Sequence, residues 1–202
     1  APGEAPTNLI NAGFYVVEPR LLERIPENAR VNIERVTFPA VAADGSLYAL
    51  GSDAYWIDTG TAASFLQANL DLVSGRRVVE AADIAPDATQ RADGVWVCGG
   101  PVIDGTVESP AFVGAAAYVA NGATVARSVI GAGARVEQGA LVAGSVLLPG
   151  ALVHRGAEVR GSIVGHGAVI GEGAQVGGLT VVQGGAAVDA GAALDGDRVQ
   201  AA

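Results

Sequence analysis

The chain of 202 residues contains no methionine and no lysine, and it has one cysteine and 5% aromatic residues. The single thiol, Cys98, excludes an intramolecular disulfide and a zinc site built from paired cysteines, and it favours a reducing, cytoplasmic location. All 12 basic residues are arginines, and the net charge of −9 argues against a nucleic-acid partner, which would need a basic face. Because no methionine is present to start translation, we expect the chain to be a piece of a longer protein.

The sequence also lacks the long continuous apolar run of a membrane span. The stretch 109–126 carries no charge, and its length alone would allow a transmembrane helix. Its apolar residues are periodic, however, and Pro110 and Gly114 interrupt them. The first seven residues contain proline and glutamate in place of the apolar core of a secretory signal. We therefore expect no contact with a membrane.

A repeat of 17 residues fills the second half of the chain, with Ser128, Ser145 and Ser162 at the same position of successive units. Three columns of the repeat are aliphatic throughout: Val113, Ile130, Leu147 and Val164; Val119, Val136, Val153 and Ile170; Val125, Val142, Val159 and Val176. A unit of 17 residues is too short for a pair of helices, and glycine is too frequent for helical structure. The pattern predicts three short strands per unit, each with one inward aliphatic side chain and with glycines at the corners.

The units Ile130 to Arg135 and Val136 to Leu141 resemble the hexapeptide repeats of left-handed parallel β-helices. The left hand is implied by this resemblance alone, because the general rule for parallel crossovers predicts the opposite hand. The expected fold is mainly β: a left-handed parallel β-helix over 95–202, a linker over 76–94, and a partial α/β segment over 1–75. We expect irregular coils at both ends, with one extra residue after position 178.

The hexapeptide fold is shared by acyltransferases, γ-class carbonic anhydrases and the regulatory tails of sugar nucleotidyltransferases, so the fold does not give the function. A zinc site like that of the anhydrases needs three histidines. The chain has only His154 and His166, which fall in different columns of the repeat, and we expect both at exposed corners. A single histidine can still act as a general base, so an acyltransferase remains an alternative.

The larger side chains gather in residues 1–75, which predict mixed α/β structure. The expected elements are strands over 9–17, 46–50 and 54–58, a short helix from Pro19, a helix over 32–43 interrupted near Pro39, and a helix capped by Thr61 and closed by Gly75. This segment is too short for a complete doubly wound domain, and we interpret it as the last part of one.

Three motifs stand in this segment: N-L-I-N-A-G-F-Y at 8–15, I-E-R-V-T-F-P at 33–39 and Y-W-I-D-T-G at 55–60. In this order, and followed by hexapeptide repeats, they resemble the C-terminal half of sugar-1-phosphate nucleotidyltransferases, in particular the bacterial mannose-1-phosphate guanylyltransferases. Thymidylyl-, uridylyl- and adenylyltransferases remain rivals. The resemblance implies attack of a sugar-1-phosphate, here mannose-1-phosphate, on the α-phosphorus of an NTP such as GTP, with release of pyrophosphate.

The same resemblance implies roles for individual residues. Asp58 would bind Mg²⁺, Glu34 would accept hydrogen bonds from sugar hydroxyls, and Asn11 and Gly13 would line the sugar pocket, with glycine allowing close backbone approach. Each role has a structural alternative. Asp58 suits an Asx turn before Gly60, Glu34 suits a solvated helix face, and Asn11 suits a polar position at a strand edge.

The chain departs from this family where nucleotides bind. The family's glycine-rich loop with its arginine and lysine is absent from the 202 residues, as is the second metal-binding aspartate. We therefore expect half of an active site and no catalysis by this chain alone, which leaves open whether it is itself an enzyme. The alternative from another class is a non-catalytic regulatory or oligomerisation module, and we expect a homo-oligomer formed through the β-helix.

Overall fold

The computed structural model describes residues 9–77 and 85–201, and the chain divides into two compact units, Ala1–Trp56 and Ile57–Ala202. Asn8 of the first motif and positions 78–84 of the expected linker lie outside the described residues. Among the residues described, no helix is long and apolar enough to cross a membrane.

Short helices form the regular structure of the first unit. They are the 3₁₀-helix η1 (Pro19–Arg24), the π-helix η2 (Ile33–Thr37) and α1 (Phe38–Ala43). The Asn32 side chain caps η2 by accepting the N–H of Arg35 at 3.0 Å. The interruption expected near Pro39 is present as a change of helix type, because the π-helix η2 ends at Thr37 and α1 begins at Phe38. Pro39 lies in the first turn of α1.

The strands expected over 9–17, 46–50 and 54–58 are wrong, because no strand is assigned in the described residues before β1. A β-strand is stable only when a neighbouring strand takes its backbone hydrogen bonds, and none of these segments pairs with another. Apolar side chains of these segments consequently reach solvent, with Phe14 85% and Leu50 97% exposed.

The second unit begins with α2 (Ala62–Val73), whose expected cap is confirmed. Thr61 Oγ1 accepts the N–H of Ser64 at 3.1 Å, and Ser64 Oγ accepts the N–H of Thr61 at 3.2 Å. This reciprocal capping box satisfies two backbone donors at the helix start. At the other end, Gly75 has a φ of +72°, the left-handed conformation expected of a residue that closes a helix.

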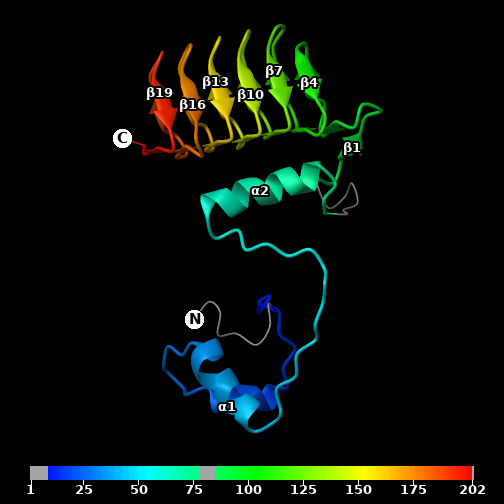
Figure 1. Cartoon of the computed structure of the whole chain (residues 1–202), viewed down its shortest axis with the longest axis vertical. Coiled ribbons are helices and arrows are strands. Elements are labelled where there is room, and N and C mark those ends of the chain that lie inside the picture. Colours follow the sequence, from blue (N-terminus) through cyan, green and yellow to red (C-terminus); the bar gives the residue numbers. More distant parts are fainter. Residues whose placement is uncertain (1–8, 78–84, 202) are drawn as a thin grey trace. The chain divides into compact units, whose positions relative to one another are not determined.

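From β2 onward, the described residues wind into a parallel β-helix with three sheets, as predicted. Within the described residues, sheet A has the order β1 (Thr89–Gln90), β2 (Trp96–Val97), β5 (Phe112–Val113), β8 (Val129–Ile130), β11 (Val146–Leu147), β14 (Ile163–Val164), β17 (Val181–Val182), β20 (Arg198–Val199). Sheet B has the order β3 (Val102–Ile103), β6 (Tyr118–Val119), β9 (Arg135–Val136), β12 (Leu152–Val153), β15 (Val169–Ile170), β18 (Ala187–Val188). Sheet C has the order β4 (Thr106–Glu108), β7 (Thr124–Ala126), β10 (Leu141–Ala143), β13 (Glu158–Arg160), β16 (Gln175–Gly177), β19 (Ala193–Asp195). Among the strands of the described residues, only β1 is antiparallel to its neighbour, and Figure 1 shows the stacked arrows of sheet C.

The predicted aliphatic columns form the interior of the β-helix. All 12 anchor residues are at most 2% exposed, and equivalent anchors pair 17 positions apart, as Val136 does with Val153. The corner glycines Gly122, Gly139, Gly156 and Gly173 have φ values between +66° and +76°. Only glycine adopts this left-handed conformation without a steric cost, which explains the uniform column.

The coil length increases by one residue at the corner after β16. Ile163 pairs with Val181, 18 positions later, whereas Val181 pairs with Arg198 at the usual interval of 17. Two consecutive residues, Gly178 and Leu179, take positive φ values of +59° and +64° at this corner. The extra residue predicted for this part of the repeat is therefore confirmed, and the corner absorbs it without changing which side chains face inward.

A ladder of buried hydroxyls lies inside the corner between sheets C and A. Ser145 Oγ accepts the N–H of Ser162 at 3.1 Å and donates to the carbonyl of Ala143 at 2.8 Å. Ser128 makes the same two contacts one coil earlier, with the N–H of Ser145 and the carbonyl of Ala126. These serines are fully buried, and each hydroxyl supplies the acceptor for a backbone N–H of the following coil.

Helix α2 packs on the outer face of sheet A (Figure 1). Leu66 of the helix, Val146 of β11 and Ile163 of β14 form a second buried cluster, separate from the interior of the β-helix. Phe65 and Leu70 add to it from the helix side. The helix belongs to the second unit for this reason, although it continues the part of the chain that carries the three motifs.

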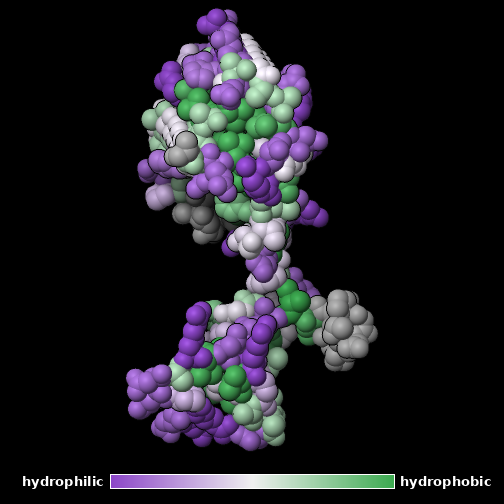
Figure 2. Space-filling view, turned by 90° about the vertical axis from the view of Figure 1, so that its left-hand side faces the viewer, coloured by the Kyte–Doolittle hydropathy of each residue, from purple (hydrophilic) through white to green (hydrophobic). Residues whose placement is uncertain are grey.

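Figure 2 faces the C-terminal end of the β-helix, where hydrophobic residues lie at the centre of the face and polar residues surround them. Leu194 and Val199 pack against the interior and remain partly exposed at this end. The last coil therefore covers the interior incompletely, although its strands pair in regular register. The expected irregular coil is found at the other end, where Trp96 pairs with Phe112 only 16 positions later.

Candidate functional site

Two of the predicted sugar-binding residues meet in the first unit. The side-chain amide of Asn11 donates a hydrogen bond to Glu34 Oε1 at 2.9 Å, although 23 positions separate the residues in the sequence. Glu34 lies in the first turn of η2, and Asn11 lies in the irregular segment before η1. All of these side chains are exposed, so the group is accessible to a ligand.

Tyr15 joins the same group, and sequence reasoning did not single it out. Its hydroxyl donates to Glu34 Oε1 at 2.6 Å and receives a hydrogen bond from the Asn11 amide. Its ring meets Phe38 of α1 edge-to-face, with 4.8 Å between the ring centres. The hydrogen bond to Glu34 raises the pKa of the Tyr15 phenol, because it stabilises the protonated form. The sequence does contain a signal for Tyr15 as a site residue, because Tyr15 ends the first motif four positions after Asn11.

Gly13 is tied to this group through the backbone. Its N–H donates to Asn11 Oδ1 at 2.9 Å, which forms an Asx turn and orients the Asn11 amide nitrogen toward Glu34. The residue has a φ of +75°, and a Cβ added there would meet no atom within 4 Å. The left-handed backbone is by itself a reason for glycine at this position, and the close approach of a sugar to Gly13 stays a prediction.

The third motif contributes to both units. The indole N–H of Trp56 donates to the carbonyl of Ala12 at 3.4 Å, which connects this motif to the N-A-G turn of the first unit. Asp58 lies in the second unit, three positions before the cap of α2. Its Oδ1 accepts the N–H of Gly60 at 2.8 Å, so the Asx turn that was the structural alternative for this residue is present.

Asp58 retains a carboxylate oxygen, Oδ2, outside the turn hydrogen bond. No group of three or more His, Cys, Asp or Glu side chains suited to a metal occurs in the described parts of the chain. Mg²⁺ commonly takes one or two carboxylates, with water and phosphate oxygens completing its shell. Asp58 therefore fits a single-carboxylate contribution to a Mg²⁺ site, and its role as a ligand stays a prediction.

On the β-helix, His154 pairs with Glu137 at the corner between sheets B and C. The distance from His154 Nδ1 to Glu137 Oε2 is 3.0 Å, and the same oxygen accepts the N–H of Arg155 at 3.1 Å. The hydrogen bond from His154 lowers the pKa of Glu137. The repeat places the two residues in one column, 17 positions apart, which is the signal that predicts their contact. His166 lies in a different column, as the sequence indicates.

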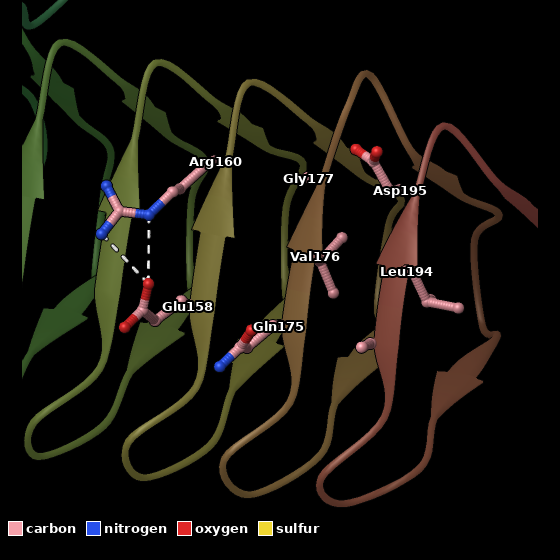
Figure 3. Close-up of a pocket in the computed structure, with 8 residues that line it drawn as sticks. Glu158, Arg160, Gln175, Val176, Gly177, Leu194 and Asp195 are labelled. Atoms are coloured by element: carbon pink, nitrogen blue, oxygen red, sulfur yellow. Dashed lines mark hydrogen bonds and ion pairs between the residues drawn. The ribbon is translucent and has the colours of Figure 1, made fainter.

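An open trough of about 340 Å³ crosses the outer face of sheet C where Gly177 has no side chain. Figure 3 shows Arg160 bound to Glu158 on one side of it and Asp195 on the other. Val176 and Leu194 are drawn there as well, but they belong to the interior. Because Glu158 already neutralises the guanidinium, the trough offers no free cation for a phosphate group.

Comparisons with known proteins agree with the two-part organisation. The model of the Nucleotidyl transferase family matches residues 2–75, and the model described as GlmU-like, C-terminal hexapeptide matches residues 106–182. The first match contains all three motifs and extends into α2. The second match covers most of the stacked coils.

Among curated proteins, the chain is similar to the mannose-1-phosphate guanylyltransferase of Mycobacterium tuberculosis, with 43% identity over 74 residues. That match covers 36% of this chain and 21% of the relative. The mannose-1-phosphate guanyltransferase of Aspergillus fumigatus is 42% identical over 65 residues, which cover 32% of this chain and 18% of the relative. The matched part thus spans about a fifth of the length of these relatives.

Among solved structures, the acetyltransferase domain of PglB from Neisseria gonorrhoeae matches with 25% identity and a TM-score of 0.26. The match covers 50% of this chain and 46% of that domain, and the score is too low to relate the two folds. The family matches are the informative ones. The chain therefore carries a segment similar to the Nucleotidyl transferase family, followed by a β-helix similar to the GlmU-like, C-terminal hexapeptide family.

Proposed function

We propose that the chain takes part in nucleotidyl transfer to a sugar-1-phosphate and supplies the sugar-phosphate side of the active site. The specific reaction is the formation of GDP-mannose and pyrophosphate from GTP and mannose-1-phosphate. The observation that carries the proposal is the hydrogen-bonded group of Asn11, Tyr15 and Glu34, inside the segment that matches the nucleotidyl transferases. The similarity to two mannose-1-phosphate guanylyltransferases supports the choice of sugar and nucleotide.

In this reaction a phosphate oxygen of the sugar-1-phosphate forms a bond to the α-phosphorus of the nucleotide, and the bond to pyrophosphate breaks. Positioning and charge stabilisation provide most of the catalysis in such transfers. Glu34 would hold the sugar through its hydroxyls, and the N-A-G turn around Gly13 would fix the orientation of Asn11. Asp58 would hold Mg²⁺, which neutralises phosphate charge when it is bound.

The chain is expected to bind the sugar-1-phosphate without turning it over, because its 202 residues include no lysine to neutralise a triphosphate. Calorimetric titration with mannose-1-phosphate should give saturable binding that Glu34→Ala abolishes. Incubation with Mg²⁺, GTP and mannose-1-phosphate should release no pyrophosphate. The absence of binding, or binding unchanged by Glu34→Ala, would refute the proposed site.

A role in assembly is the second candidate, and the outer face of sheet B favours it. Val102, Tyr118, Leu152 and Val169 point outward there, and in the described second unit α2 covers sheet A only. Self-association through this face would produce the homo-oligomer that the β-helix predicts. The one cysteine, Cys98, is free, which is compatible with the cytoplasmic location that we propose. Sedimentation of the chain with Leu152→Glu, compared with the unmodified chain, tests this candidate.

A further inference from the structure

We infer that Tyr15 is a positioning residue that fixes Glu34, so that the site selects ligands which donate a hydroxyl hydrogen to Glu34 Oε2. The inference rests on the proposed function, and it adds a residue and a rule of ligand selection to it. It comes from the direction of the hydrogen bonds in the group rather than from the sequence motif.

Two side-chain donors of the group, the Asn11 amide and the Tyr15 hydroxyl, point toward the same carboxylate oxygen of Glu34. Glu34 Oε1 accepts hydrogen bonds from the Asn11 amide at 2.9 Å and from the Tyr15 hydroxyl at 2.6 Å. The Asn11 carbonyl oxygen is already used by the N–H of Gly13, so the amide cannot be turned around without losing that bond. The orientation of the whole group is therefore determined by the backbone at Gly13.

The two carboxylate oxygens of Glu34 therefore differ in their hydrogen bonding. Oε1 is held by two donors, whereas no described residue donates to Oε2. An ionised carboxylate only accepts hydrogen bonds, so a ligand that fits Oε2 must bring an O–H or N–H donor. The hydroxyls of a hexose are such donors, and an analogue that lacks the contacting hydroxyl leaves the oriented carboxylate unpaired.

Tyr15 is the member whose removal tests this arrangement most directly. Tyr15→Phe deletes only the hydroxyl and retains the ring contact with Phe38, so the packing of α1 is preserved. The carboxylate of Glu34 then keeps one donor of two and can rotate. We expect the affinity for a hexose-1-phosphate to fall about tenfold, the usual effect of losing one hydrogen bond to a charged group.

The experiment is calorimetric titration of the full chain with mannose-1-phosphate and with its 2-, 3-, 4- and 6-deoxy analogues. The unmodified chain should discriminate against at least one analogue, and Tyr15→Phe should weaken binding of the parent sugar and reduce that discrimination. Tyr48→Phe is the matched control, because Tyr48 is in the same unit, is 87% exposed and makes no hydrogen bond among the described residues.

A ligand-free measurement separates the inference from the proposed function. In NMR titration of ¹³C-labelled tyrosines, the Tyr15 phenol should lose its proton at higher pH in the unmodified chain than in Glu34→Gln. If mannose-1-phosphate does not bind, the proposed function and the ligand rule both fail. If it binds and Tyr15→Phe changes neither affinity nor discrimination, the positioning role alone is overturned.

Discussion

Replacing Ser145 by alanine tests how the corners of the β-helix are held together. The substitution removes the acceptor of the Ser162 N–H, which lies in a fully buried part of the corner. The carbonyl of Ala143 loses the serine hydroxyl but keeps the N–H of Gly161 at 2.9 Å. The main cost is therefore one unsatisfied buried N–H, worth about 1–3 kcal/mol of unfolding free energy.

Ser162→Ala is the matched control for Ser145→Ala, because both serines belong to the same ladder of hydroxyls. Ser162 donates to the carbonyl of Arg160, but no described backbone N–H donates to its hydroxyl. The equivalent N–H, that of Thr180, bonds to the carbonyl of Gly177, because the extra residue at the corner displaces it. Ser162→Ala should consequently cost less than Ser145→Ala, about 1 kcal/mol or below.

Urea unfolding followed by circular dichroism gives both free energies, and hydrogen exchange reports on the single amide. In Ser145→Ala, the Ser162 amide should exchange faster relative to its neighbours than it does in the unmodified chain. Equal stabilities for the two alanine variants, or an unchanged exchange rate at Ser162, would refute the assignment of the hydroxyl as the acceptor.

Three further outcomes follow from the geometry. Val136→Asp places an unpaired charge in the closed interior, so it should lower the free energy of unfolding in urea by more than about 4 kcal/mol. Glu137→Ala, at the neighbouring surface position, should lower it by no more than about 1 kcal/mol. The carboxylate of Glu137 has a lowered pKa, so its contribution to stability is present above its ordinary value of 4.5 and is lost as the pH falls below it. Glu137→Gln should therefore lose less stability than the unmodified chain between pH 6 and pH 3, and parallel melting curves would contradict this. Asp58→Asn should leave the melting temperature unchanged, because asparagine makes the same Asx turn. The same variant should abolish any Mg²⁺ dependence of binding when GTP and mannose-1-phosphate are titrated together.

The β-helix was predictable because its information is local and repeated. Each inward position, such as Val136, recurs at a fixed interval, and parallel pairing turns that interval directly into the register between coils. The corner glycines and the extra residue near Leu179 could be found by the same alignment. The hydroxyl ladder could not be derived, because the repeat places Ser145 and Ser162 in register without showing which backbone groups need them.

The first unit was predicted less well for a physical reason. Apolar runs such as 46–50 have the composition of strands, but a strand forms only if another segment pairs with it, and composition does not reveal the partner. The motifs still identified Asn11 and Glu34, which the structure brings together. Tyr15 and the backbone constraint at Gly13 became visible only when the direction of each hydrogen bond could be followed.

Helix α2 changes how the stacked coils are coupled. In a solenoid each repeat contacts only its neighbours, so unfolding can begin at an open end and proceed coil by coil. Here one hydrophobic cluster joins the helix to side chains from four successive strands of sheet A, from Val129 of β8 to Val181 of β17. Losing one of these coils disturbs the helix and therefore its contacts with the other three. This part of the chain should consequently unfold as a single cooperative block, whereas the coils outside the reach of the helix can fray independently.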